Sequence, residues 1–304
     1  MGTVSAGRAI AAGFRLVGRE PLSFLVWMAA YLLVGVLPQI GAFALVAPAW
    51  SRMMRELTAT ADAGGAMPSA EMMRMQLQMM QAQPIAWLAG VVSHTLVLSA
   101  IYRAVLFPEE RRFFYLRLGK RELWLGLVML VLAVMLFLAF LALMLPLAVI
   151  GGIVAAVSPD SRMVGAVIAL MVLMGLGVGL WAALRLSMAT PMSFAENGFR
   201  LYESWGVTRG HAGKMFLVGL ALAVIIWIAE LVVAGGAIGA VGTAGFEHLG
   251  DWFRHPHFDL ASATPWIVAG CVAAAFLSTA FFTLFGAAWA EIYRELSGKT
   301  QPAV

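Results

Sequence analysis

Two ionisable side chains lie inside long apolar stretches of the sequence: His94 in residues 84–106 and Glu230 in residues 215–241. At about 1.5 Å per residue, His94 is about 15 Å from the outer end of its stretch, and Glu230 is about 24 Å from Lys214 at the inner end. An unpaired charge in hydrocarbon is costly. If the two helices pack together, the sequence predicts a protonatable pair or a small polar cavity. The structural alternative is that His94 bonds a backbone carbonyl and that Glu230 is protonated or reaches a loop donor.

An arginine stands at the end of three apolar stretches, at the edge that the charge distribution described below assigns to the cytoplasm. The three are Arg103, Arg185 and Arg294. A planar guanidinium donates two hydrogen bonds at once to a phosphate, so the three arginines are candidate lipid-phosphate contacts. The alternative is that each side chain extends to the headgroups without forming a site.

Two outer segments contain side chains that bind metals. Soft thioethers select Cu(I), and the segment 50–83 holds eight methionines: Met53, Met54, Met67, Met72, Met73, Met75, Met79 and Met80. Several of them recur at helical spacing, which is typical of a helix lying on a bundle or a membrane. The segment 247–259 has three histidines and three carboxylates but no recognised zinc spacing. We expect no metal and no cofactor, with metal binding by either segment as the alternative.

No catalytic constellation is visible in the sequence. It contains no paired cysteines, no His-Glu-x-x-His and no nucleophile elbow. Glycines such as Gly175, Gly177 and Gly179 lie inside an apolar stretch, where small residues let helices approach closely. We therefore expect a protein that is not an enzyme.

The composition places the chain in a membrane. Hydrophobic residues make up 62% of the 304 residues and charged residues 12%, against roughly 25% charged residues in soluble proteins. The formal net charge is +4, and the basic residues gather at the ends of apolar stretches. That distribution favours anionic lipid headgroups as partners over nucleic acid; a protein partner is the alternative.

Six apolar stretches are long enough to cross a bilayer as helices. The predicted spans are 22–46, 84–106, 123–150, 163–188, 215–241 and 265–290, joined by outer loops at 47–83 and 244–264. The third stretch continues to residue 157, and Pro146 with Gly151 and Gly152 is expected to break it. The predicted architecture is one all-α membrane domain over residues 1–304.

The positions of lysine and arginine predict the orientation. With the amino terminus inside, fifteen of these residues fall in inner segments and five in outer loops. The positive-inside rule then places both termini in the cytoplasm.

A unit of amphipathic segment, span and helix-end arginine recurs along the chain. Residues 5–20 predict a helix with Arg8, Arg15 and Arg19 on one side, suited to the headgroup plane or to packing against the bundle. Basic and aromatic residues also precede the third and fifth spans, at 113–121 and 199–214. We hypothesise three two-helix repeats, each preceded by an interfacial amphipathic helix. The alternative is that any helix end attracts such residues at the interface.

The stretches 21–31, 109–119 and 199–210 carry a resemblance to a known group. The chain resembles a largely uncharacterised bacterial group of six-span inner-membrane proteins, similar to the membrane domain of some glycerophosphodiester phosphodiesterases. The resemblance also implies a bacterial inner membrane as the location. We expect no soluble phosphodiesterase domain in this chain. The resemblance therefore implies an architecture and no catalytic residue.

Two classes of function remain open from the sequence. The first is a non-enzymatic membrane protein that interacts with lipid or with a membrane partner through amphipathic helices and helix-end arginines. The second is a transporter or channel with a polar cavity near His94 and Glu230. Because a transporter usually has more intramembrane polarity than two ionisable groups, the sequence favours the first class.

Overall fold

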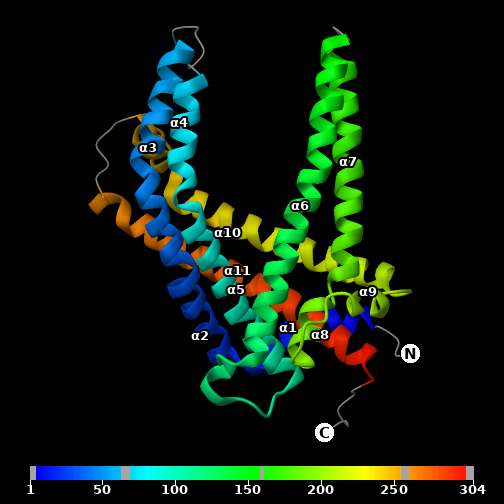
Figure 1. The fold of residues 1–304 in the computed structure, drawn as a ribbon. Coiled ribbons are helices and arrows are strands. Elements are labelled where there is room, and N and C mark those ends of the chain that lie inside the picture. The colour runs from blue at the N-terminus through cyan, green and yellow to red at the C-terminus, as the bar shows by residue number, and fades with distance from the viewer. Residues whose placement is uncertain (1–4, 63–68, 158–160, 255–259, 299–304) are drawn as a thin grey trace.

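A computed structural model describes residues 5–62, 69–157, 161–254 and 260–298. These residues are helical apart from short connections, with no strand among them. In chain order, the elements are α1 (Ala6–Arg19), α2 (Pro21–Tyr31), the π-helix η1 (Leu32–Val36), α3 (Leu37–Asp62), α4 (Ser69–Met80), α5 (Gln83–Leu106), the short 3-10 turn η2 (Arg112–Tyr115), α6 (Lys120–Val157), α7 (Ser161–Leu186), α8 (Ala189–Ala195), α9 (Glu203–Val207), α10 (Ala212–Arg254) and α11 (Leu260–Leu296) (Figure 1).

Six helical segments of the described chain are long and apolar enough to cross a membrane, which confirms the predicted all-α, six-span class. They cover Pro21–Leu57, Met72–Leu106, Arg112–Val154, Gly165–Ala195, Ala212–Gly236 and Val268–Leu296. Helices suit a bilayer because each one satisfies its own backbone hydrogen bonds where no water is available. The side of the membrane on which the termini lie stays a prediction.

Helices extend further than the sequence predicts. α3 continues to Asp62 and α10 to Arg254, inside segments expected to be outer loops. α6 passes through Pro146 and ends at Val157, so the predicted break is absent. An interior proline removes one backbone hydrogen bond, and membrane helices tolerate this loss where neighbouring groups or a local adjustment of the helix satisfy the freed carbonyl.

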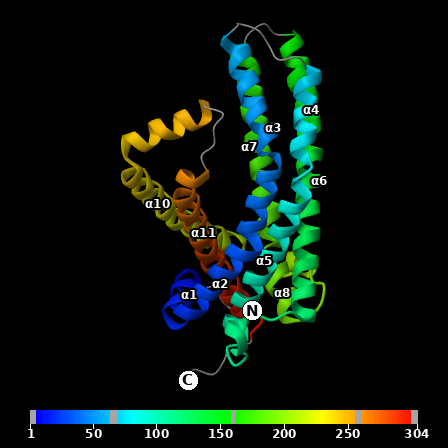
Figure 2. The same cartoon turned by 90° about the vertical axis from the view of Figure 1, so that its left-hand side faces the viewer.

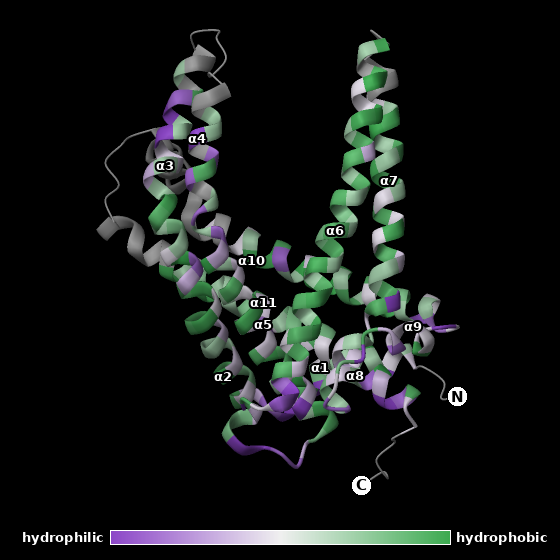
Figure 3. Cartoon of the chain, viewed as in Figure 1, coloured by the Kyte–Doolittle hydropathy of each residue, from purple (hydrophilic) through white to green (hydrophobic). Residues whose placement is uncertain are grey.

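The packed core lies at one end of the molecule, which we call the polar end: α1, the loop 107–119, α8, α9 and the parts of α2, α5, α6, α10 and α11 that adjoin them. Hydrophilic residues gather there (Figure 3). From this end α3 with α4 and α6 with α7 rise as two hairpins, while α10 and α11 lean away together (Figure 2). Most large side chains of α7 and of the second half of α6 are exposed and apolar, as expected of lipid contact.

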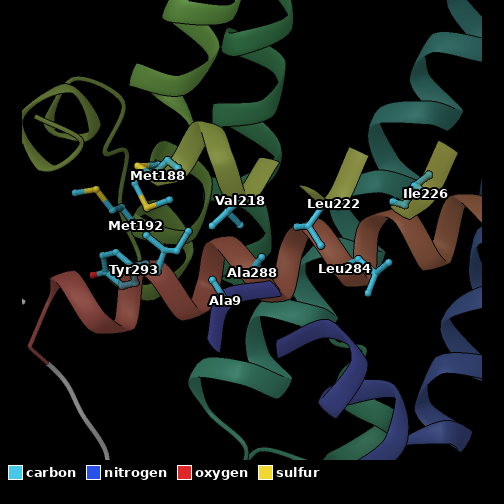
Figure 4. Packing of buried hydrophobic residues seen from close by; sticks show 11 residues of the cluster. Ala9, Met188, Met192, Val218, Leu222, Ile226, Leu284, Ala288 and Tyr293 are labelled. Carbon is cyan, nitrogen blue, oxygen red and sulfur yellow. The ribbon is translucent and has the colours of Figure 1, made fainter. Parts of the chain in front are cut away.

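α11 is the centre of the core. Ala288 and Ile292 of α11 are buried in one cluster. The cluster also contains Met188, directly before α8, Met192 of α8 and Leu222 of α10 (Figure 4). α1 and α5 pack on other sides of α11 and approach it closely through glycine. A Cβ on Gly13 of α1 would come within 2.7 Å of the Leu284 backbone, and one on Gly286 within 2.7 Å of the Leu98 side chain.

The three segments that precede the odd spans differ in structure. α1 packs against α10 and α11, which was one of the two predicted locations for residues 5–20, and its buried stripe includes Ala9, Ala12 and Leu16. Phe14 of α1 is exposed. The segment before the third span forms the 3-10 turn η2 in place of the expected helix, and the segment before the fifth forms the short helix α9.

Candidate functional site at the helix-end arginines

Arg103 is a buried structural charge. Arg103 lies near the end of α5 and is only 3% exposed. The guanidinium donates to the Tyr115 carbonyl oxygen at 2.6 Å and to the carboxylate of Glu122, and its Nε lies 3.2 Å from Glu110 Oε2. The Phe194 ring centroid is 5.5 Å from its Cζ. Two carboxylates therefore compensate the charge of Arg103 inside the protein, although its buried Nε makes no hydrogen bond. Contact of Arg103 with a lipid phosphate stays a prediction.

Glu110 also ties down the loop that follows α5. Its carboxylate lies 3.2 Å from Arg121 and 3.5 Å from Arg117, as well as beside Arg103. The guanidinium of Arg121 stacks 4.1 Å from the centre of the Phe107 ring. These charges gather around one half-buried carboxylate, so the loop 107–119 is fastened to the ends of α5 and α6.

Arg294, near the end of α11, is paired within its own helix. Its Nη2 lies 2.5 Å from Glu291 Oε2, one turn earlier, as residues three apart on a helix allow. The side chain of Glu291 is buried and that of Arg294 is 30% exposed. The charge of Arg294 is therefore largely compensated before any lipid is present.

Arg185, near the end of α7, is the helix-end arginine without a carboxylate among the described residues. Its Nε and Nη1 atoms are buried and have no hydrogen-bond partner there. The Cζ atom lies 5.9 Å from the Trp181 ring centre and 5.8 Å from the Trp205 ring centre. The two indoles meet edge to face at 4.8 Å. We call this group of three residues the tryptophan–arginine site.

The turn that carries Trp205 is held against the end of α7. Ser204 Oγ donates to the Arg185 carbonyl oxygen at 2.8 Å, and Thr208 Oγ1 donates to the same oxygen at 3.3 Å. Both hydroxyl residues are buried. These bonds fix the position of Trp205 relative to Arg185, although twenty residues of sequence separate the two.

The carboxylates of this region are already occupied by another arginine. Arg200 lies 3.0 Å from Glu196 and 2.8 Å from Glu203. The hydrogen bond from Arg200 lowers the pKa of the exposed Glu203 carboxyl, and Glu203 in turn raises the pKa of Arg200. Glu196 also accepts a hydrogen bond from the Tyr293 hydroxyl at 3.0 Å. These interactions leave neither carboxylate for Arg185.

His94 and Glu230 are not brought together. The His94 ring lies 4.6 Å from Phe282 and stacks at 5.8 Å on Tyr31, whose hydroxyl is 3.4 Å from Nε2. Glu230 is exposed on α10. Within the described residues no hydrogen bond or ion pair links them. The predicted carbonyl partner of His94 is replaced by the Tyr31 hydroxyl.

The surroundings of His94 include an irregular backbone. The π-helix η1 begins directly after Tyr31. Gly35 within it faces Ser93, because a Cβ at residue 35 would lie 2.8 Å from Ser93 Oγ. Single-turn π-helices occur often at functional sites. A polar group of Tyr31, Ser93 and His94 thus lies inside the apolar region.

The described residues contain no group of three or more His, Cys, Asp or Glu side chains arranged to hold a metal ion. Met72, Met73 and Met80 are exposed on α4. Met67 and residues 255–259 lie outside the described residues, and so do the side chains of 247–254, so the metal alternatives for these segments stay predictions.

Comparisons with known proteins leave the chain without an assigned relative: no protein-family model, no curated protein and no solved structure matches it. The resemblance to six-span inner-membrane proteins therefore stays a prediction.

Arg185 lies at the predicted helix end, but the two tryptophans around it were not predicted. Trp181 precedes Arg185 by one helical turn. This spacing puts both residues on one face of the helix, so their contact could have been predicted from the sequence. Trp205 gives no such signal, because it reaches Arg185 only through the packing of α9 on α7.

Proposed function

We propose that this integral membrane protein is not an enzyme and binds the phosphate of anionic lipids at the tryptophan–arginine site. The observation that carries the proposal is the pair of buried Arg185 donors, Nε and Nη1, without a hydrogen-bond partner among the described residues. Leaving buried donors of a charged group unpaired is costly, on the order of 1–3 kcal/mol or more. A phosphate beside the guanidinium would supply the opposite charge, and a small movement of the Arg185 side chain would bring Nε and Nη1 within reach of its oxygens.

The surroundings of Arg185 suit a headgroup. The residue ends a long apolar helix, which is where a bilayer gives way to its phosphates. Tryptophans are enriched at this depth, and rings within about 6 Å of a guanidinium attract it and limit its rotation. Arg209, exposed one residue after Thr208, adds positive charge next to the site.

Lipid retention tests the proposal. Wild type, Arg185→Gln and Arg294→Gln are purified from one membrane preparation, and bound phospholipids are counted by native mass spectrometry at equal detergent. Arg185→Gln should lose most bound phosphatidylglycerol. Arg294→Gln, which removes an equivalent charge from a paired residue, should keep it. Arg185→Lys should retain less than wild type, because lysine lacks the two-pronged donor geometry.

The outcome that contradicts this proposal is equal retention of phosphatidylglycerol by wild type and Arg185→Gln. Equal loss in Arg185→Gln and Arg294→Gln would also contradict it, since net charge alone would then explain binding. Retention of zwitterionic phosphatidylethanolamine gives the internal reference for unspecific lipid.

A transporter is the second candidate, favoured by the polar group of Tyr31, Ser93 and His94 beside a π-helix. In that case His94→Asn should abolish a pH-driven flux into proteoliposomes, while Glu230→Gln, on an exposed position, should leave it unchanged. Flux that survives His94→Asn at the wild-type rate would reject this candidate.

The cytoplasmic position of the termini and the inner-membrane location belong to the same proposal. The position of the termini rests on the excess of basic residues at the polar end, and the inner-membrane location rests on the resemblance to six-span inner-membrane proteins. Reporter fusions at residue 298 and in the loop 107–119 should report the same side of the membrane. A fusion in the segment 63–68 should report the opposite side.

A further inference from the structure

Three consecutive aromatic residues adopt a left-handed backbone. Phe113, Phe114 and Tyr115 have φ angles of 51°, 55° and 67°. This region is unfavourable for side chains with a Cβ, and a run of such residues is rarer still. Strain of this kind persists only where the surroundings enforce it, and it points to a function of the strained segment.

The enforcing contacts come from the ends of two spans. Trp27 Nε1 of α2 donates to the Phe114 carbonyl oxygen at 2.8 Å, and Arg103 of α5 donates to the Tyr115 carbonyl oxygen at 2.6 Å. Tyr115 is itself buried, and its hydroxyl donates to the Pro108 carbonyl oxygen at 3.4 Å. Burial and hydrogen bonds therefore all act on the last two residues of the turn.

What the turn exposes is apolar. Phe113 is 85% exposed and Leu118 is 84% exposed. Neither belongs to a packed cluster of the described residues. The strained backbone thus buries Tyr115 and, in doing so, directs Phe113 outward.

The depth of the turn favours lipid around Phe113. Trp27 lies about 9 Å along α2 from Pro21, where the first span begins, and its side chain leans back toward that end. Its bond to Phe114 keeps the turn level with the first turns of the span. Arg111, at the start of the loop, pairs with Glu20 at 2.9 Å, directly before α2. Figure 1 shows the loop beside the lower end of α2.

The charge of the loop matches an anionic surface. Residues 108–121 hold five basic and two acidic side chains. Arg112 and Lys120 are exposed, and neither has an ion pair within the described part of the chain. Exposed aromatic side chains next to basic ones are typical of a segment that enters the headgroup region.

We propose that the turn Phe113–Tyr115 is a lipid anchor, which inserts Phe113 and Leu118 into the leaflet at the polar end while Arg112 and Lys120 contact anionic phosphates. The anchor does not require the tryptophan–arginine site, which lies on α7 and α9. It would fix the depth of the loop that closes the buried network of Arg103.

Lipid quenching tests the anchor. Phe113→Cys and, separately, Leu118→Cys are made in a Cys271→Ser background and labelled with the fluorophore NBD. The full chain is placed in nanodiscs of phosphatidylcholine and phosphatidylglycerol containing a spin-labelled lipid. Leu136→Cys on the exposed face of α6 serves as the lipid reference, and Ser297→Cys, exposed after α11, as the aqueous reference.

Labels at 113 and 118 should be quenched by the spin-labelled lipid several-fold more than the label at 297, and should resist aqueous iodide. Adding Arg185→Gln should leave the quenching unchanged, so a failed phosphate site would not be mistaken for a failed anchor. Iodide quenching of both labels at the level of residue 297 would overturn the anchor and would favour a soluble protein partner for this turn.

Discussion

Arg103 and Arg185 occupy the same place in the sequence pattern but have different surroundings in the structure. Each stands near the polar end of the molecule, at the end of an even-numbered span. The segment after α5 supplies Glu110 and Glu122 to Arg103, whereas the segment after α7 supplies Trp205 and uses its two carboxylates on Arg200. The following segment therefore decides whether a helix-end arginine has a counter-charge inside the protein: Arg103 has one, and Arg185 has none among the described residues.

The largest expected effect comes from breaking the internal pair. Arg103→Ala should destabilise the protein by about 3–5 kcal/mol, because Glu122 is left buried and uncompensated. Thermal unfolding in detergent, read by loss of the monodisperse peak, measures the effect. Arg103→Met combined with Glu122→Gln should recover part of the loss. If the double variant is as unstable as Arg103→Ala, the uncompensated charge of Glu122 is not the cause of the destabilisation.

Arg185 should behave in the opposite way. Without anionic lipid, Arg185→Gln should leave the unfolding temperature unchanged or raise it, since the change removes unpaired donors and leaves no protein carboxylate unpaired. Phosphatidylglycerol should raise the unfolding temperature of wild type and should not raise that of Arg185→Gln. At a hundredfold excess over Kd, lipid binding should stabilise the folded wild type by about 2–3 kcal/mol. An equal rise in both proteins would place the lipid elsewhere.

The turn held by Arg103 gives a smaller effect. Phe114→Gly should be neutral or stabilising by up to about 1 kcal/mol, because glycine accepts a positive φ and Phe114 is exposed. Tyr115→Gly should be destabilising, since it removes a buried ring. Thermal unfolding of the two variants compares them directly, and a destabilising Phe114→Gly would show that the ring itself is needed.

The smallest expected effect concerns the exposed ion pair between Arg200 and Glu203, near Arg185. Because Arg200 lowers the folded pKa of Glu203, the pair contributes stability above the ordinary carboxyl pKa and loses it as pH falls through the folded pKa. Wild type should unfold at a slightly higher temperature than Glu203→Gln at pH 7, and the gap should close in acid and in high salt. A gap that widens in acid would contradict this assignment.

The six spans could be predicted because they depend on one local property, a sufficiently long apolar run. The partners of Arg103 could not, because Glu122 lies nineteen residues away and reaches it only after α5 and α6 pack. The pairing of Glu291 with Arg294 was foreseeable from helical spacing. The proposed meeting of His94 and Glu230 required contact between two particular spans, and no sequence pattern specifies which helices become neighbours.

Glu295 has a consequence for the order of assembly. Its carboxylate accepts a hydrogen bond from the Ser5 backbone N–H at 2.8 Å and pairs with Arg8 at 2.9 Å, across 290 residues of sequence. A ribosome that adds about 5–20 residues per second needs about 15–60 s to travel that distance. During this interval α1 has been synthesised, but α11, against which it packs, has not. The buried stripe of α1 must therefore contact the membrane or a chaperone until α11 is present. α11 therefore completes the packing of α1 only after the helices between them have been synthesised.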